Sequence, residues 1–183
     1  MTSLMFPLDN AKVSWDTKFT QSWDIAEQKT ASGRRRTLCQ QTLPAWVINV
    51  TYPMLTKAEK DALLGFYAQC KGKFMSFWYK DAEEHFVRWL DLEKGSDGTY
   101  QCLINYGGFT EPALKVDDLK VFVDGICTYN FTEQNGKITI NTTGAVSASY
   151  DYYWRVCFGV SISISQKFQD FYTANIKLEV VRE

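Results

Sequence analysis

The residues best suited to chemistry are five cysteines and a single histidine. The cysteines are widely spaced and form no Cys-x-x-Cys pair of the kind that binds zinc or exchanges disulfides. A cysteine nucleophile needs a neighbouring base, and His85 lies in a stretch with the composition of a strand. We therefore expect reduced, structural cysteines that pack as small apolar residues. They are Cys39, Cys70, Cys102, Cys127 and Cys157.

Two pairs of adjacent carboxylates are the other candidates for catalysis, Glu83-Glu84 and Asp117-Asp118. Neighbouring residues in a strand point to opposite faces, so neither pair converges on one substrate. Neither has a spacing typical of glycosidase or metal chemistry. The sequence thus predicts no catalytic residue, no metal ligand and no cofactor, and we do not expect an enzyme.

One helix is predicted, over about 57–71. Thr56 and Glu59 have the spacing of a capping box, in which each side chain accepts a backbone hydrogen bond at the start of a helix. Leu63, Phe66, Tyr67 and Cys70 then recur at three- and four-residue intervals and form one apolar stripe. Gly72 follows the last of these, where a residue without Cβ favours helix termination.

The remainder is typical of antiparallel β-structure. Asp124-Gly125 and Asn135-Gly136 are strong hairpin turn pairs, because the favoured turn needs positive φ at both central residues. Short aromatic and β-branched runs extend from residue 84 onward. They are 86–90, 99–104, 119–123, 137–141, 148–156, 160–164 and 176–180. The expected fold class is mainly β: an antiparallel β-sandwich or partly open barrel with one flanking α-helix.

The composition is that of an ordinary globular chain, with 183 residues and a net charge of −1. We predict a single β-rich domain over 1–183. Residues 1–30 are expected to form an extended N-terminal arm or loop, which packs through Trp15 and Trp23 against a neighbouring subunit or its own sheet. Residues 31–91 form a strand-strand-helix-strand unit, and 92–183 add the further antiparallel strands. Neither a signal peptide nor a membrane-spanning run is evident, which indicates cytoplasmic synthesis and no membrane insertion.

The order of several motifs resembles the distal tail proteins of phages, in the compact family shared with gene transfer agents. Phe6-Pro7, Ala31-Ser-Gly33 followed by arginines, and Pro44-x-Trp46 resemble the opening of that family. Further matching motifs follow in the same order along most of the chain. They are Leu55-Thr-x-x-Glu59, Phe66, Gly72, Asp81, Val121-Phe-Val-Asp-Gly125, Asn135-Gly-Lys-Ile-Thr139, Gly144-Ala145, Tyr150-Asp-Tyr152 and Ile176-x-Leu-Glu-Val180. The sequence departs from the family at 161–166, which is serine-rich, and at 37–41, which is less basic.

The resemblance implies a structural virion protein of the tail tip or baseplate. Six copies would form a ring at the distal end of the tail tube, between the tube protein and the central hub protein. Such a ring leaves a channel through which DNA passes without sequence-specific binding. The protein would be assembled in the cytoplasm of the bacterial host and reside in the virion tail.

Aromatic residues make up 15% of the chain, and tyrosine and tryptophan are favoured at protein interfaces. We therefore expect a subset of them to contact neighbouring subunits. The interface candidates are Trp15, Trp23, Trp78, Tyr79, Tyr152, Tyr153 and Trp154. Arg34, Arg35 and Arg36 either line the channel, pair with acidic residues of the next subunit, or lie at a solvated strand end or loop.

A carbohydrate-binding module of a tail tip or adhesion apparatus is the alternative function. β-Sandwiches bind sugars through exposed aromatic rings, and such a module needs a platform of those rings on its surface.

Overall fold

The computed structural model describes Leu4–Arg182. The predicted fold class is confirmed: the chain is mainly β, with several antiparallel sheets and one α-helix. Its contacts divide it into two compact units, here called unit 1 (Met1–Phe6 and Phe77–Arg155) and unit 2 (Pro7–Ser76 and Val156–Glu183). This division is not evident from the sequence, because the last change of unit lies inside a strand and no Gly- or Ser-rich linker marks the others.

Unit 2 is built on an antiparallel sheet in which β4 (Ala45–Leu55) lies between β1 (Lys18–Ser22) and β17 (Phe171–Val180). The other edge of β17 pairs with Val156–Phe158 of β15 (Trp154–Phe158) and with β16 (Ser163–Phe168). Ile48, Val50 and Tyr52 alternate along β4 and are fully or almost fully buried. The long central strand therefore supplies one side of the core of this unit.

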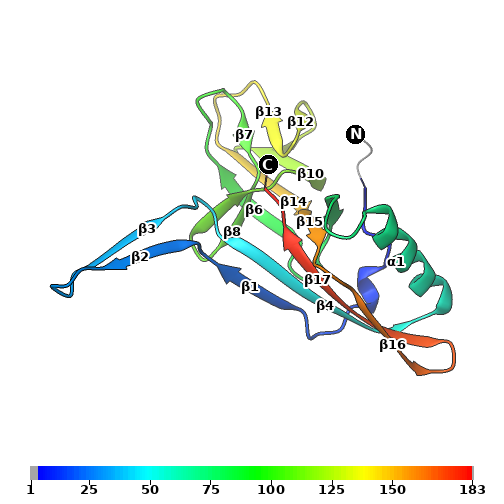
Figure 1. Ribbon diagram of the computed structural model, residues 1–183. Coiled ribbons are helices and arrows are strands. Elements are labelled where there is room, and N and C mark those ends of the chain that lie inside the picture. The colour runs from blue at the N-terminus through cyan, green and yellow to red at the C-terminus, as the bar shows by residue number, and fades with distance from the viewer. Residues whose placement is uncertain (1–3, 183) are drawn as a thin grey trace. The chain divides into compact units, whose positions relative to one another are not determined.

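Helix α1 (Lys57–Gln69) lies against β4 and β17 (Figure 1). Leu63, Phe66 and Cys70 of the predicted stripe are buried, and the Phe66 ring meets Phe158 edge to face at 5.9 Å. Tyr67, the fourth member, is less buried and donates its hydroxyl to the Val160 carbonyl at 3.0 Å. Gly72 has φ +64°, as expected of a residue that terminates a helix. The predicted helix is thus confirmed within two residues of its expected end.

The capping box of α1 is present and extends to a third residue. Thr56 Oγ1 accepts the Glu59 backbone N–H at 3.4 Å, and Glu59 Oε2 accepts the Thr56 N–H at 2.9 Å. Glu59 Oε1 also pairs with Lys12 Nζ at 2.5 Å. These bonds lower the pKa of Glu59 from its ordinary 4.5 to about 2, chiefly through Lys12 and then Thr56. The carboxylate therefore stabilises the folded chain above about pH 4.5, and that stabilisation is lost as the pH falls toward 2.

The capping box gives a prediction about stability. We expect Thr56→Ala to lower the free energy of unfolding by about 1 kcal/mol, because the Glu59 backbone N–H loses its acceptor, whereas Thr56→Ser changes it little. Glu59→Gln retains the capping geometry but removes the charge. Its deficit relative to the wild type should therefore be present at pH 7 and shrink between pH 4.5 and 2. Urea unfolding across this range measures both effects, and a deficit independent of pH would contradict the assigned role of Glu59.

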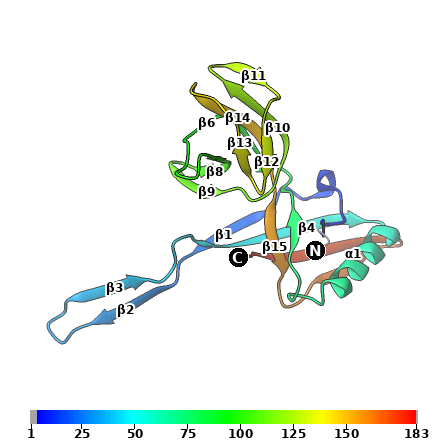
Figure 2. The same cartoon turned by 90° about the horizontal axis from the view of Figure 1, so that it is seen from above.

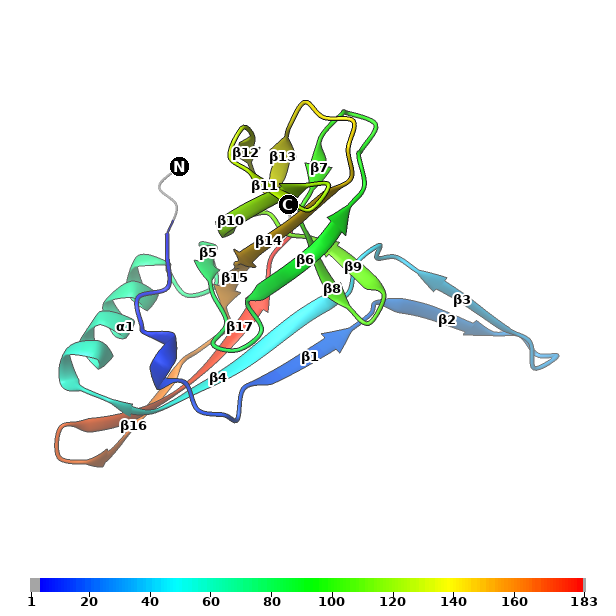
Figure 3. The ribbon, with the colours of Figure 1, turned by 180° about the vertical axis from the view of Figure 1, so that it is seen from behind.

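Unit 1 contains a four-stranded antiparallel sheet in the order β11 (Ile126–Thr128), β10 (Val116–Val123), β14 (Val146–Tyr152) and β6 (Phe86–Leu92). It also contains a three-stranded sheet, β12 (Thr132–Gln134), β13 (Lys137–Thr139) and β7 (Tyr100–Gln101), and the pair β8 (Leu103–Tyr106) and β9 (Phe109–Pro112). The strand β5 (Phe77–Tyr79), which lies beside β15 in Figure 3, belongs to the same unit by its contacts. Both predicted turn pairs are confirmed, since all four of their residues have positive φ.

Tyr150 links two of these sheets through its phenol. The Tyr150 hydroxyl donates to the Leu103 carbonyl at 2.6 Å and accepts the Leu103 N–H at 2.7 Å. Its side chain is fully buried, and burial raises the pKa of the phenol above its ordinary value. The core of unit 1 therefore contains a polar group whose two hydrogen bonds fix the start of β8.

Candidate subunit interface

An exposed β-hairpin is the most unusual feature of unit 2. Strands β2 (Ile25–Lys29) and β3 (Arg35–Cys39) form a two-stranded sheet of their own, and all ten of their residues are exposed. The hairpin connects β1 to β4 and extends beyond the ends of these two strands (Figure 2). An isolated two-stranded hairpin is at best marginally stable in water, because it has no apolar face to bury. This hairpin is therefore the element of the unit that most needs a partner.

The side chains of the hairpin suit a protein contact. Ile25 and Leu38 are 52% and 62% exposed and lie on opposite faces of the ribbon. Large apolar side chains on both faces of a free ribbon are costly in water and favourable when covered. The Asp24 carbonyl accepts the Gln40 N–H at 3.2 Å and closes the base of the hairpin.

The three predicted arginines belong to this hairpin. Arg34 lies in its turn, next to Gly33 with φ +79°, and Arg35 and Arg36 begin β3. Arg35 Nη2 pairs with Glu27 Oε2 at 2.9 Å, and Lys29 Nζ lies 4.0 Å from the same carboxylate. Residues 25–39 contain four basic side chains and one acidic one, so the hairpin carries a net charge of +3. All three arginines are exposed in the single chain, as the alternative of a solvated strand end or loop requires.

The two units carry opposite net charges. Unit 2 contains thirteen Lys and Arg residues and nine Asp and Glu residues, a net charge of +4. Unit 1 contains seven and twelve, a net charge of −5. The chain's overall charge of −1 therefore hides a separation of charge between its two halves. Two copies would attract each other when unit 2 of one approaches unit 1 of the other.

Three of the predicted aromatic interface residues belong to the core. Tyr79, Tyr152 and Trp154 are 0%, 4% and 4% exposed. The Trp154 ring stacks on Tyr106 and meets Tyr152 edge to face. The expectation that these three contact a neighbouring subunit is therefore replaced by a packing role. Adjacent aromatics do point to opposite faces of a strand, as argued from the sequence, but the face bearing these residues is covered by the chain itself.

Trp78 and Tyr153 are half-buried and lie among cations. Lys115 Nζ lies 5.7 Å from the Trp78 ring centroid and 5.3 Å from that of Tyr153. Arg155 also lies over Trp78, and Lys80 over Tyr153. Such contacts orient the rings and leave only part of each accessible to a partner.

The tryptophans of the N-terminal segment differ from their expected setting. Trp15 is 94% exposed, so it does not pack against its own sheet. Trp23 is 40% exposed and lies between β1 and β2. Within the expected arm or loop, residues 18–22 and 25–29 are strands, because β1 pairs with β4 and β2 with β3. Both tryptophans stay available as interface candidates.

The groups considered for catalysis are placed as follows. Cys70, Cys102 and Cys157 are buried, and burial raises the pKa of each thiol, that of Cys102 to about 12. Cys39 and Cys127 are exposed. Between Leu4 and Arg182, no three His, Cys, Asp or Glu side chains are grouped so as to hold a metal ion. Within the same residues, no helix is long and apolar enough to cross a membrane.

His85 lies next to an ion-pair network that sequence analysis did not find. Asp151 accepts from Lys80 Nζ at 2.8 Å and from Arg88 Nη2 at 2.9 Å, and His85 Nε2 lies 3.9 Å from the same carboxylate. Burial raises the pKa of Asp151, but the bonds from Lys80 and Arg88 outweigh it and hold the pKa below its ordinary value. Two cations already neutralise this carboxylate, so it is a poor base and its role is structural.

A scan against protein-family models and a search of curated proteins each find no match for this chain.

Proposed function

We propose that this protein is a structural subunit of a phage tail, forming a closed ring at the distal end of the tail tube. Its partners would be further copies of itself, six in the ring, together with the tube protein above and the hub protein below. DNA would pass through the central channel without sequence-specific contacts. The observation that carries the proposal is the β2–β3 hairpin, whose ten strand residues are all exposed and include the large apolar side chains of Ile25 and Leu38.

Two further observations support a ring. A ring needs head-to-tail contacts, in which two different surfaces of each subunit meet. Unit 1 and unit 2 have net charges of −5 and +4, so unlike units of two copies attract each other and like units repel. The order of motifs resembling the distal tail family, from Phe6-Pro7 to Ile176-x-Leu-Glu-Val180, supports the same role.

The proposal is tested by the mass of the assembly. Light scattering across a concentration series should reveal a species of six 21.1-kDa chains, and negative-stain images should show rings with a central channel. Because the proposed contact includes charged residues, we expect the assembly to weaken as salt is raised. A monomer at every concentration and salt would contradict self-assembly as the basis of the function.

A further inference from the structure

Trp89, on strand β6 of unit 1, has a backbone conformation that bulky residues rarely adopt. Its φ is +53°, in the left-handed region. Val87 pairs with Tyr150 and Leu90 with Ala148, so β6 contains one residue more than β14 over this stretch. That is a β-bulge, and the Ser149 hydroxyl holds it by accepting the Trp89 N–H at 3.0 Å. A glycine would adopt this φ without strain, whereas the bulky side chain of Trp89 makes the same conformation strained.

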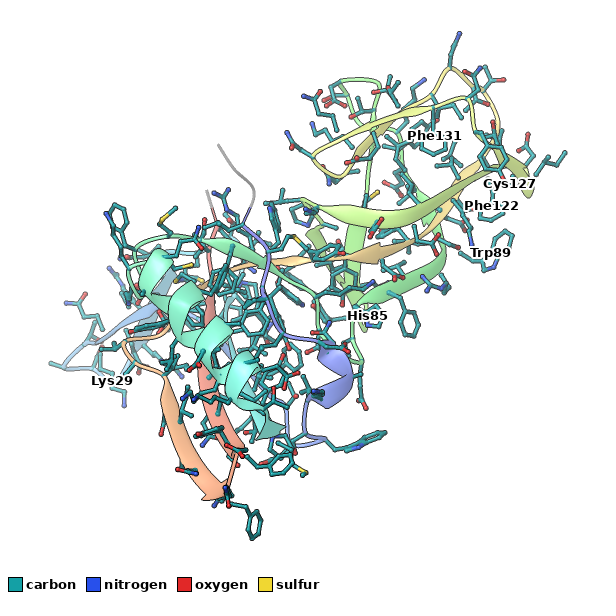
Figure 4. The ribbon with its side chains drawn as sticks, turned by 90° about the vertical axis from the view of Figure 1, so that its right-hand side faces the viewer. Lys29, His85, Trp89, Phe122, Cys127 and Phe131 are labelled. Atoms are coloured by element: carbon teal, nitrogen blue, oxygen red, sulfur yellow. The ribbon has the colours of Figure 1, made fainter. Side chains whose placement is uncertain are left out.

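The bulge places Trp89 against Phe122 on the solvent-facing side of the four-stranded sheet. The two rings stack with centroids 4.1 Å apart and an interplanar angle of 27°. Figure 4 shows the two side chains next to each other, projecting from neighbouring parts of the sheet. Trp89 is nevertheless 60% exposed. Phe122 therefore fixes the orientation of an indole that remains largely open to solvent.

Polar groups with small or flexible side chains surround this stack. Ser147 on the central strand β14 pairs with Phe122 on one side and with Asp91 on the other. Lys120 lies two residues before Phe122 and so on the same face of β10. Asp91 and Lys120 are exposed and Ser147 is half-buried. A carboxylate, a hydroxyl and an ammonium thus flank the aromatic stack, with both donors and acceptors available.

We infer that Trp89 and Phe122 form a stacking platform for the pyranose ring of a neutral oligosaccharide. The apolar C–H face of the sugar would lie on the indole, and Asp91, Ser147 and Lys120 would bind its hydroxyls. A rigid exposed ring with a few polar groups beside it is the arrangement that small-molecule sites use for orientation and specificity. The net charge of −5 on unit 1 disfavours acidic glycans. This inference is independent of the proposed ring, because the site lies within one unit of one chain.

The experiment uses the full chain and an array of neutral oligosaccharides built from glucose, galactose, mannose or N-acetylglucosamine, with sialylated and uronic-acid glycans as acidic probes. Retained glycans are then titrated against tryptophan fluorescence. We expect saturable binding of at least one neutral oligosaccharide and weaker or no binding of the acidic probes.

The variants make the assignment specific. Trp89→Ala should weaken binding by about tenfold or more, since it removes the stacking surface, while Trp89→Phe retains part of the affinity. Trp15→Ala, at a tryptophan that is 94% exposed in unit 2, is the matched control and should leave the affinity unchanged. Asp91→Ala changes an exposed side chain and should lower the affinity even if the Trp89 variants fold poorly.

Three results would overturn the inference. The first is the absence of saturable binding to every neutral glycan up to about 10 mM, a concentration that still detects weak sites. The second is binding that Trp89→Ala and Asp91→Ala both leave unchanged. The third is a Trp89→Ala variant that binds no less sugar but loses self-association, which would assign this surface to a protein partner.

Discussion

Replacing residues 25–39 with Asn-Gly is expected to abolish self-assembly while the rest of the chain stays folded. Asp24 and Gln40 already form the hydrogen-bonded pair that a two-residue turn requires, with the Asp24 carbonyl accepting the Gln40 N–H. Strands β2 and β3 pair with each other and are exposed throughout, so their removal takes little from the core. Circular dichroism should show a fold that melts within a few degrees of the wild type, and light scattering should show only monomers.

A point variant tests the same contact while changing only one side chain. Leu38→Asp places a charge on an exposed apolar position of the hairpin and should reduce assembly strongly. Val160→Asp is the matched control, because Val160 is 84% exposed and lies in unit 2 outside the hairpin. Assembly of the shortened variant into a species with as many chains as the wild-type assembly would exclude the hairpin as the subunit contact.

The largest loss of stability is expected from Gly136→Ala, in the turn between β12 and β13. Gly136 has φ +74°, and a Cβ at this position would lie 1.7 Å from the Ala113 carbonyl oxygen. The added methyl group therefore clashes with backbone, which cannot move without disturbing the Cys102 N–H bond to the Gly136 carbonyl at 2.8 Å. We expect a loss of about 3–5 kcal/mol in the free energy of unfolding, measured in urea.

Gly98→Ala separates the clash from the backbone conformation. Gly98 has φ +79°, but a Cβ there would meet nothing within 4 Å. Only the cost of the left-handed conformation remains, about 1 kcal/mol. Equal losses for the two variants would show that φ alone determines the cost at Gly136 and that the close approach to Ala113 is relieved easily.

The features predicted well from the sequence are those set by local interactions. The capping box at Thr56 and Glu59, the stripe of Leu63, Phe66 and Cys70, and the two turn pairs each depend on residues a few positions apart. Their geometry follows from backbone sterics and short-range hydrogen bonds, which a sequence displays directly.

The features that were missed depend on residues distant in sequence. Tyr79, Tyr152 and Trp154 are of residue types favoured at interfaces, but their exposure depends on which other residues cover them. Trp154, for example, is covered by the Tyr106 ring. The chain passes from one unit to the other three times, so the division depends on pairing between segments distant in sequence. The exposed aromatic stack depends on a bulge at Trp89. The backbone of Trp89 is in the left-handed region, which tryptophan rarely adopts.

The hairpin could have been recognised in part. Residues 25–39 contain one strongly apolar position on each strand among charged and polar ones, a pattern too polar for a strand that packs in a core. The signal was the combination of strand-forming residues, a Gly-containing turn and a net charge of +3. Sequence alone did not show that none of the other strands between Leu4 and Arg182 would pair with it.

Amide hydrogen exchange of the hairpin tests the central claim most directly, because it reports whether a second copy covers β2 and β3. The exchange of peptides spanning residues 25–39 would be compared between the largest assembled species and a dilute monomeric sample. We expect rapid exchange in the monomer, since both strands are exposed, and strong protection in the assembly. Equally rapid exchange in both samples would contradict the assignment of the hairpin as the contact that closes the ring.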